Sequence, residues 1–136
     1  MKLQKATRCA LFAVLELAAD PKNQLSANEI AEKYGISTNH LAKVLRSLGR
    51  VGLVEAVRGA GGGYRFSGNA RRTTLLDVIQ LFETIDPIAQ GEREDGDDTP
   101  EGEGLCRVLT EIEDTARATF ASISLDTMLK LVVRYR

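Results

Sequence analysis

The stretch from Ser26 to Arg50 constrains this chain most, because it encodes two capped helices joined by a tight turn. Ser26 is a predicted N-cap, and Glu29 can reach back to the N–H of the cap as in a capping box. Gly35 supplies the left-handed residue that ends a short helix, and Ser37 caps the next helix two residues later. The apolar residues of the second helix recur at helical spacing: Leu41, Val44, Leu45, Leu48 and Val51. The pattern indicates a helix-turn-helix.

A hairpin is predicted directly after this unit. Gly52 stops the second helix, and the β-prone runs 53–57 and 64–66 flank the glycine-rich segment 58–63. A helix-turn-helix followed by a two-stranded hairpin is the layout of a winged helix. We therefore expect a mainly α fold, a winged helix-turn-helix with a small β-hairpin wing and a long C-terminal dimerisation helix.

Four further helices complete the prediction. The segment 3–19 is nearly continuously apolar in its second half, which predicts a central packing helix that ends before Pro21. Thr74 caps a helix that ends at Pro87, and Ser124 or Asp126 caps a short terminal helix. A long helix runs from 105 to about 122. Its apolar seam has spacings of three, four, three and four and predicts a dimer interface: Leu109, Ile112, Ala116, Thr119 and Ile123.

Charge is distributed unevenly along the chain. Residues 1–72 hold 12 Lys and Arg against 5 Asp and Glu, whereas residues 73–136 hold 6 against 14. The basic half suits a polyanion such as nucleic acid. The segment 90–104 holds seven acidic residues and no apolar one, so we expect a solvated loop that repels DNA; a site for a hard cation is the alternative, although the spacing is not that of an EF-hand. The predicted organisation is a winged helix-turn-helix DNA-binding domain (1–87), an acidic flexible loop (88–104), and a dimerisation helix with a C-terminal short helix (105–136).

Composition excludes several classes of protein. A chain of 136 residues forms one domain, and its two cysteines can build neither a disulfide framework nor a Cys-x-x-Cys zinc site. The longest apolar run, 9–19, is interrupted by Glu16 and is too short for a membrane span. His40 is the single histidine, and no nucleophile with a supporting base emerges. We expect a cytoplasmic protein that is not an enzyme and has neither a membrane partner nor a small-molecule substrate.

The outer face of the second helix and the wing are the candidate DNA-binding surface. Residues at the start of the helix can contact bases or phosphates, and the basic residues follow about a turn apart. In the wing, glycines allow close approach to the sugar-phosphate edge, and a tip arginine suits a narrow minor groove. An ordinary solvated helix face and a plain flexible turn are the alternatives, and His40 has either a structural role or a phosphate contact. The candidates are Ser37, Thr38, Asn39, His40, Lys43, Arg46, Arg50, Arg58, Gly59, Gly62, Tyr64 and Arg65.

Three segments together resemble the IscR/NsrR (Rrf-two) family of bacterial repressors. These are ISTNHLAKVL at 36–45, GLV with VRGAGGGYR between 52 and 65, and TLLDV at 74–78. The resemblance covers nearly the whole chain, and the sequence around Asn39 and His40 is most similar to that of the nitric-oxide-sensing branch. It implies a homodimeric winged helix that binds an operator and uses an iron–sulfur cluster as its sensor.

This chain differs from the family in the residues that would bind an iron–sulfur cluster. Cluster-binding members carry three cysteines before the dimer helix, of which only the last has a counterpart, Cys106; the positions six and twelve earlier are Pro100 and Glu94. The acidic residue that completes coordination in the nitric-oxide branch corresponds to Arg8. The cofactor is therefore unknown: an iron–sulfur cluster is conceivable, but the usual three-cysteine set is absent.

Cys106 remains the redox or cluster candidate. Its place near a helix N-terminus and beside Arg107 favours the thiolate, although it could equally be a relic, and Cys9 is expected in the core. Three hypotheses follow: a thiol switch, an atypical cluster shared by two copies, and a repressor that is constitutive or controlled by a partner. The predicted function is a dimeric, sequence-specific repressor that responds to redox, nitric-oxide or iron–sulfur status. A protein-interaction module whose basic face meets an acidic partner is the alternative.

Overall fold

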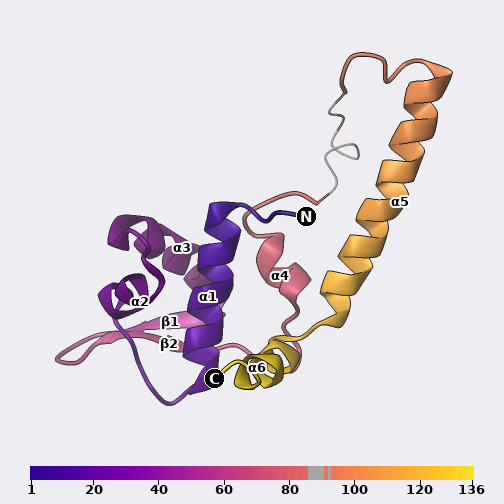
Figure 1. Ribbon diagram of the computed structural model, residues 1–136. Coiled ribbons are helices and arrows are strands. Elements are labelled where there is room, and N and C mark those ends of the chain that lie inside the picture. The colour runs from indigo at the N-terminus through magenta and orange to yellow at the C-terminus, as the bar shows by residue number, and fades with distance from the viewer. Residues whose placement is uncertain (86–90, 92) are drawn as a thin grey trace.

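The computed structural model describes residues 1–85, 91 and 93–136 and is mainly helical (Figure 1). Helices α2, α3, α4 and α6 and a short hairpin gather around α1, whereas α5 extends away from them. The bounds are α1 Lys5–Ala19, α2 Ala27–Tyr34, α3 Thr38–Arg50, β1 Val54–Val57, β2 Gly63–Phe66, α4 Leu75–Ile79, α5 Pro100–Ser122 and α6 Leu125–Val133.

Helix α1 is the central packing element, as its apolar sequence predicts. It contacts α2, α3, α4, α6 and β2. Ala10, Ala13 and Val14 have no exposed surface, and Cys9 is buried among them as expected. Burial raises the pKa of the Cys9 thiol, and nearby Lys5 and Arg8 only partly offset this effect. Cys9 is therefore an inert core residue.

The helix-turn-helix forms as predicted. The Ser26 Oγ accepts from the backbone N of Glu29 at 3.0 Å, and the Ser37 Oγ accepts from the backbone N of His40 at 3.3 Å. Gly35 ends α2 with φ of 64° and ψ of 36°, a left-handed conformation that glycine adopts without strain. One detail differs. The Glu29 carboxylate accepts from the Ser26 hydroxyl at 3.1 Å rather than from its backbone N–H, because a hydroxyl can donate and accept at once.

The wing is an antiparallel hairpin. Val54 lies opposite Phe66, and Val57 lies opposite Gly63. Its tip reverses through Gly59 and Gly61, whose φ angles are 104° and 72°. The α1–α2 loop adds an edge through a bridge between Leu25 and Tyr64.

Helix α4 is shorter than expected. The predicted cap is confirmed, since Thr74 and Asp77 form a reciprocal capping box. The helix nevertheless ends at Ile79, and the chain continues through turns that return to α1. There the Glu83 carboxylate accepts from the Thr7 hydroxyl and from the backbone N of Gln4 at 2.9 Å. Pro87, the predicted end, lies outside the described residues.

Helix α5 begins five residues earlier than predicted, at Pro100. The segment 100–104 is therefore helical rather than part of an acidic loop; residues 88–90 and Glu92 of the predicted loop 88–104 lie outside the described residues. The Thr99 Oγ1 caps the helix by accepting from the backbone N of Gly102 at 3.0 Å. Pro100 suits the first helical position, and Glu101 and Glu103 interact favourably with the positive end of the helix dipole.

The junction between α5 and α6 is joined to the segment that follows the wing. The Leu75 N donates to the Ile123 O at 2.9 Å, and the Leu125 N donates to the Thr73 O at 2.8 Å. The Asp126 N donates to the Ala70 O at 2.9 Å, and Leu125 is fully buried. The winged region, which comprises the described residues 1–85, thus holds one end of α5 through backbone hydrogen bonds. Among the described helices, none combines the length and apolarity that a bilayer crossing requires.

Candidate nucleic-acid interface

Helix α3 separates an apolar inner face from a polar outer one. Leu41, Leu45 and Leu48 have no exposed surface. The predicted contact residues lie on the exposed side: Ser37, Thr38, Asn39, Lys43, Arg46 and Arg50. The Thr38 hydroxyl lies 3.4 Å from the Asn28 Oδ1, which links the start of α3 to α2. The arrangement presents three cations and several short polar side chains along one helix.

His40 lies differently from its neighbours. It is half-buried, and its Nε2 is buried without a hydrogen bond to the described residues. This placement favours the structural role over the phosphate contact.

The wing tip exposes Arg58. Gly59 has a positive φ, and a Cβ on Gly62 would lie 2.5 Å from the Val57 O, so the tight reversal requires glycine at both positions. A thin tip that carries an exposed arginine has the shape and charge to enter a narrow groove lined with phosphates.

Two other predicted wing residues are engaged within the protein. Arg65 forms an ion pair with Glu55, its cross-strand neighbour. Tyr64 is half-buried and packs against the core. Arg58 is therefore better placed than Arg65 to offer unneutralised positive charge.

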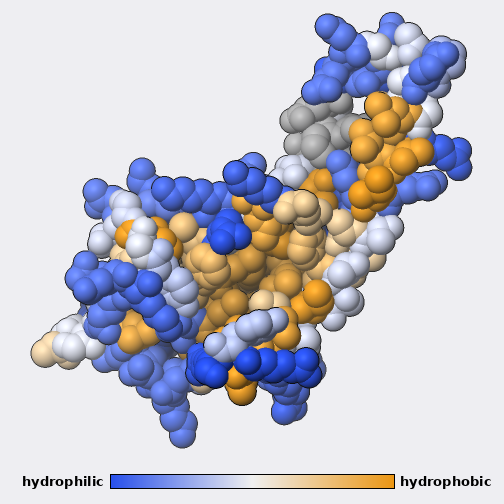
Figure 2. All heavy atoms as spheres, in the orientation of Figure 1, coloured by the Kyte–Doolittle hydropathy of each residue, from blue (hydrophilic) through white to orange (hydrophobic). Residues whose placement is uncertain are grey.

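The outer face of α5 is apolar and exposed. None of the residues of α5 is buried, and Leu105, Val108 and Ile112 are 58%, 54% and 59% exposed. Leu109 is 41% exposed, and Figure 2 shows apolar surface on α5 at a distance from the winged region. Monomeric proteins seldom expose contiguous apolar patches of this kind, which usually mark interaction surfaces.

The structure revises both ends of the predicted seam. Ile123 directly follows α5 and packs against the core of its own chain, so it is not available to a partner in the way that Ile112 is. Leu105 and Val108 extend the exposed face in the other direction. Both residues already lie in the helix that the sequence predicts, and the spacing of three residues from Leu105 to Val108 and of four from Val108 to Ile112 is the signal that could have identified them. Of the other residues in the predicted seam, Ala116 is half-buried and Thr119 is exposed.

Cys106 lies in the second turn of α5 and is half-exposed. Partial desolvation and the hydrogen-bonded Asp97 carboxylate raise the pKa of its thiol, while Arg93 acts in the opposite direction. Arg107 instead faces Glu111 at 3.7 Å. The expectation of a favoured thiolate is therefore wrong, because the chain before α5 folds a carboxylate onto the sulfur.

The residues present do not fit an iron–sulfur cluster. Pro100, at one of the ligand positions that the resemblance implies, has no donor atom, and partial desolvation and the Asp97 carboxylate raise the pKa of the Cys106 thiol, which must lose its proton to bind iron. Within the described part of the chain, no three His, Cys, Asp or Glu side chains cluster as a metal site.

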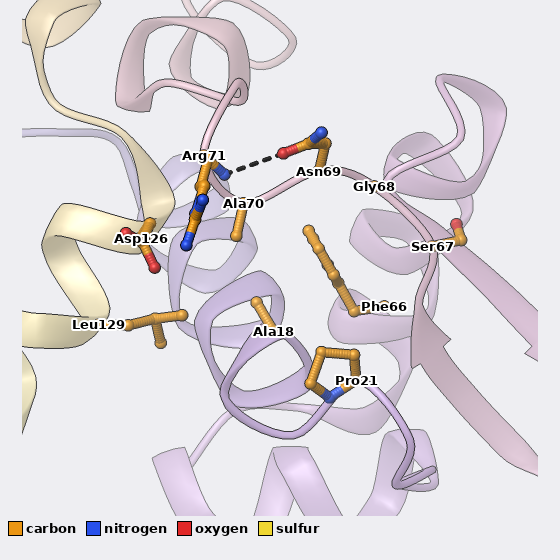
Figure 3. A pocket seen from close by; sticks show the side chains of 10 residues that line it. All are labelled: Ala18, Pro21, Phe66, Ser67, Gly68, Asn69, Ala70, Arg71, Asp126 and Leu129. Atoms are coloured by element: carbon orange, nitrogen blue, oxygen red, sulfur yellow. Dashed lines mark hydrogen bonds between the residues drawn. The ribbon is translucent and has the colours of Figure 1, made fainter.

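A pocket of about 510 Å³ lies between the end of β2, α1 and α6 (Figure 3). Its polar groups serve the fold. The Asn69 Oδ1 accepts from the Arg71 backbone N at 3.1 Å, the Ser67 hydroxyl donates to the Gly52 O at 2.8 Å, and Asp126 pairs with Lys130 at 3.2 Å. These partners leave no serine activated by a base in the pocket lining.

Comparison with known proteins agrees with this geometry. Residues 3–131 match the Rrf2 family, described as an iron-dependent transcriptional regulator. The HTH-type transcriptional regulator BadM of Rhodopseudomonas palustris is 53% identical over 132 residues, which cover 97% of this chain and 83% of BadM.

Solved structures show the same fold. IscR of T. potens has a TM-score of 0.76 at 26% identity and is matched over 97% of this chain and 88% of its own. CymR of B. subtilis, described as the global cysteine regulator, has a TM-score of 0.78 at 26% identity, over 96% and 98% of the two chains. The oxidized form of Staphylococcus aureus CymR also has a TM-score of 0.78 at 26% identity, over 95% and 96%.

Proposed function

Because this chain belongs to the Rrf2 family of transcriptional regulators, we propose that it acts in the bacterial cytoplasm as a homodimeric repressor on an inverted-repeat operator. The exposed polar and basic face of α3 carries this proposal. In Figure 1, α2, α3 and the hairpin tip lie on the side of α1 away from α5. This separation leaves room for DNA on one side and for a second copy on the other.

In the proposed dimer, helix α3 of each copy is the recognition helix: it lies in the major groove and contacts one half-site. Ser37, Thr38 and Asn39 at the start of α3 approach base edges or phosphates, and Lys43, Arg46 and Arg50 follow along the groove. Arg58 enters the adjacent minor groove from the wing, where a narrow groove concentrates negative potential. The acidic C-terminal half stays away from phosphate.

The apolar face of α5 pairs with its counterpart in a second copy. Burial of Leu105, Leu109 and Ile112 would remove exposed apolar side chains from water. The backbone hydrogen bonds that hold Ile123 and Leu125 against residues 73–75 transmit the orientation of α5 to the winged region. A dimer built in this way has a fixed separation between its two recognition helices, which sets the half-site spacing.

For the signal, we favour a thiol over a resident cluster. The S. aureus CymR neighbour was solved in an oxidized form. Cys106 is half-exposed near the N-terminus of α5, the proposed dimer helix. A peroxide would convert Cys106 to sulfenic acid and release water, and because the pKa of the thiol is raised, this oxidation should be slow near neutral pH and should accelerate as pH rises. If Cys106→Ser leaves an oxidant response of operator binding unchanged, this part of the proposal fails, and a regulator without a thiol signal remains.

The salt dependence of DNA binding tests the interface. We expect the logarithm of affinity for a duplex, selected by the protein from a random-sequence pool, to fall steeply and linearly with the logarithm of salt concentration. Arg46→Gln on α3 should reduce the slope by about one, because one phosphate contact is lost. The matched variant Arg107→Gln on α5 should leave it unchanged. A flat salt dependence, or equal effects of the two variants, would contradict the proposal.

A further inference from the structure

The wing tip is held by a side chain from a distant part of the chain. Gln24, in the loop between α1 and α2, donates from its Nε2 to the backbone O of Gly61, 37 residues further along. Gly61 lies at the turn of the wing, three residues after Arg58. The bond therefore connects the α1–α2 loop to the segment that carries the exposed arginine.

The backbone next to Gln24 reinforces this connection. The Leu25 N donates to the Tyr64 O at 2.9 Å, and the Tyr64 N donates to the Leu25 O at 2.7 Å. The approach is so close that a Cβ on Gly63 would lie 2.4 Å from the Leu25 O. The α1–α2 loop thus pairs with β2 on the side away from β1, and glycine is required at position 63 for this close approach.

The tip itself has little to define its direction. Gly59 and Gly61 adopt positive φ, and the Gly62 N donates to the Gly59 O at 2.9 Å as a bond internal to the turn. Glycine-rich segments retain much conformational freedom when nothing outside them restrains them. Gln24 supplies such a restraint, because it joins Gly61 in the turn to a loop that α1 and α2 hold in place.

We propose that Gln24 is a positioning residue for DNA recognition: its bond to the Gly61 carbonyl holds the wing so that Arg58 points into the minor groove. The inference rests on the proposed function, since it concerns how the wing of an operator-binding protein is aimed. Gln24 acts on DNA through the Gly61 peptide rather than by contact. Its contribution should therefore exist only while Arg58 is present to be aimed.

A double-mutant cycle tests this dependence on the full-length protein with the pool-selected duplex. Gln24→Met keeps the length of the side chain and removes the donor. We expect affinity to fall about three- to ten-fold in the otherwise native chain, the range for loss of one hydrogen bond. In the Arg58→Ala background, Gln24→Met should cause no further loss. Asn23→Ala, which leaves the bond to Gly61 intact, should behave like the native chain.

Two outcomes overturn the inference. An equal loss from Gln24→Met with and without Arg58 would mean that Gln24 contacts DNA itself, and no loss in either background would mean that the tether has no role. The proposed function is judged separately, by whether the native chain binds the duplex and whether Arg58→Ala weakens it. Thermal unfolding should be unchanged in Gln24→Met, and faster amide exchange at Gly61 and Gly62 in the free protein would reveal the loosened tip directly.

Discussion

The winged region and α5 use apolar residues in opposite ways. In α3, Leu41, Leu45 and Leu48 have no exposed surface and pack against the rest of the winged region. In α5, by contrast, Leu105 and Ile112 are more than half exposed, and none of the residues of the helix is buried. One region has completed its core within the chain, whereas the other still has apolar surface to cover.

Charge follows the same division. The half of the chain that includes α3 and the wing is basic, and the half that includes α5 is acidic. A basic region whose apolar residues are already buried can bind DNA without a change of fold. An acidic helix with an exposed apolar face is better suited to bind another protein than to bind phosphate. The difference supports the proposal that one region recognises DNA and the other associates with a second copy.

The largest effect should come from a cavity in the winged region. Leu45→Ala removes a side chain that is fully buried and should lower the free energy of unfolding by about 2–5 kcal/mol. Urea unfolding at several protein concentrations measures it, and the loss should be the same at each concentration. A loss below about 1 kcal/mol would mean that the core of α3 is far looser than its burial indicates.

A charge on the apolar face of α5 should act on association instead. Ile112→Asp should weaken self-association by at least about 100-fold, because the carboxylate would be desolvated in the interface. Sedimentation velocity over a range of concentrations measures this change. Ala118→Asp, on an exposed part of α5 away from that face, is the matched control and should leave the dimer intact. Equal behaviour of both variants would show that the interface lies elsewhere.

A smaller, pH-dependent effect should appear where α1 meets α2. Burial alone would raise the pKa of Glu16, but hydrogen bonds from Lys33 and Tyr34 outweigh it and hold the pKa below its usual value. The stabilisation is therefore present above the unfolded pKa of about 4.3 and is lost as pH falls through the lower folded pKa. Glu16→Gln should cost about 1 kcal/mol at pH 7 and almost nothing at the acid end.

The control for this prediction is Glu32→Gln, which removes a carboxylate from the exposed surface of α2. It should change stability by less than about 0.5 kcal/mol at either pH. A Glu16→Gln cost that persists unchanged in acid would mean that packing, and not the charge, links α1 to α2.

The smallest effect concerns Cys106. Because partial desolvation and Asp97 raise the pKa of this thiol, less thiolate is present at neutral pH, and alkylation should be slower than for an unperturbed cysteine. Asp97→Asn should lower that pKa and accelerate the reaction, which labelling followed by mass spectrometry can time. Asp98→Asn, its exposed neighbour, serves as the control. An unchanged rate in Asp97→Asn would remove the carboxylate from the explanation.

Local signals were sufficient to predict the winged helix. Ser26, Gly35 and Ser37 act through hydrogen bonds and backbone angles that span a few residues, so their residue types alone indicate where helices begin and end. The start of α5 was missed because glycines and carboxylates favour a loop, although Thr99 and Pro100 already form a helix-start pattern.

Contacts between distant segments could not be predicted in this way. The bond from Gln24 to Gly61, the packing of Ile123 on its own core and the approach of Asp97 to Cys106 all depend on how the chain returns to itself. Neither spacing nor composition determines such approaches. Among the candidate site residues, sequence alone could therefore identify the exposed cations of α3 but could not distinguish the exposed Arg58 from the paired Arg65.

The mass of the protein–DNA complex tests most directly whether DNA recognition and self-association belong to separate regions. Sedimentation of the native chain with the pool-selected duplex should show two chains bound per duplex, and Ile112→Asp should bind as one chain with lower affinity and an unchanged fold. One native chain per duplex at saturation, with the affinity and salt dependence of the native complex retained in Ile112→Asp, would contradict the assignment of recognition and association to separate regions.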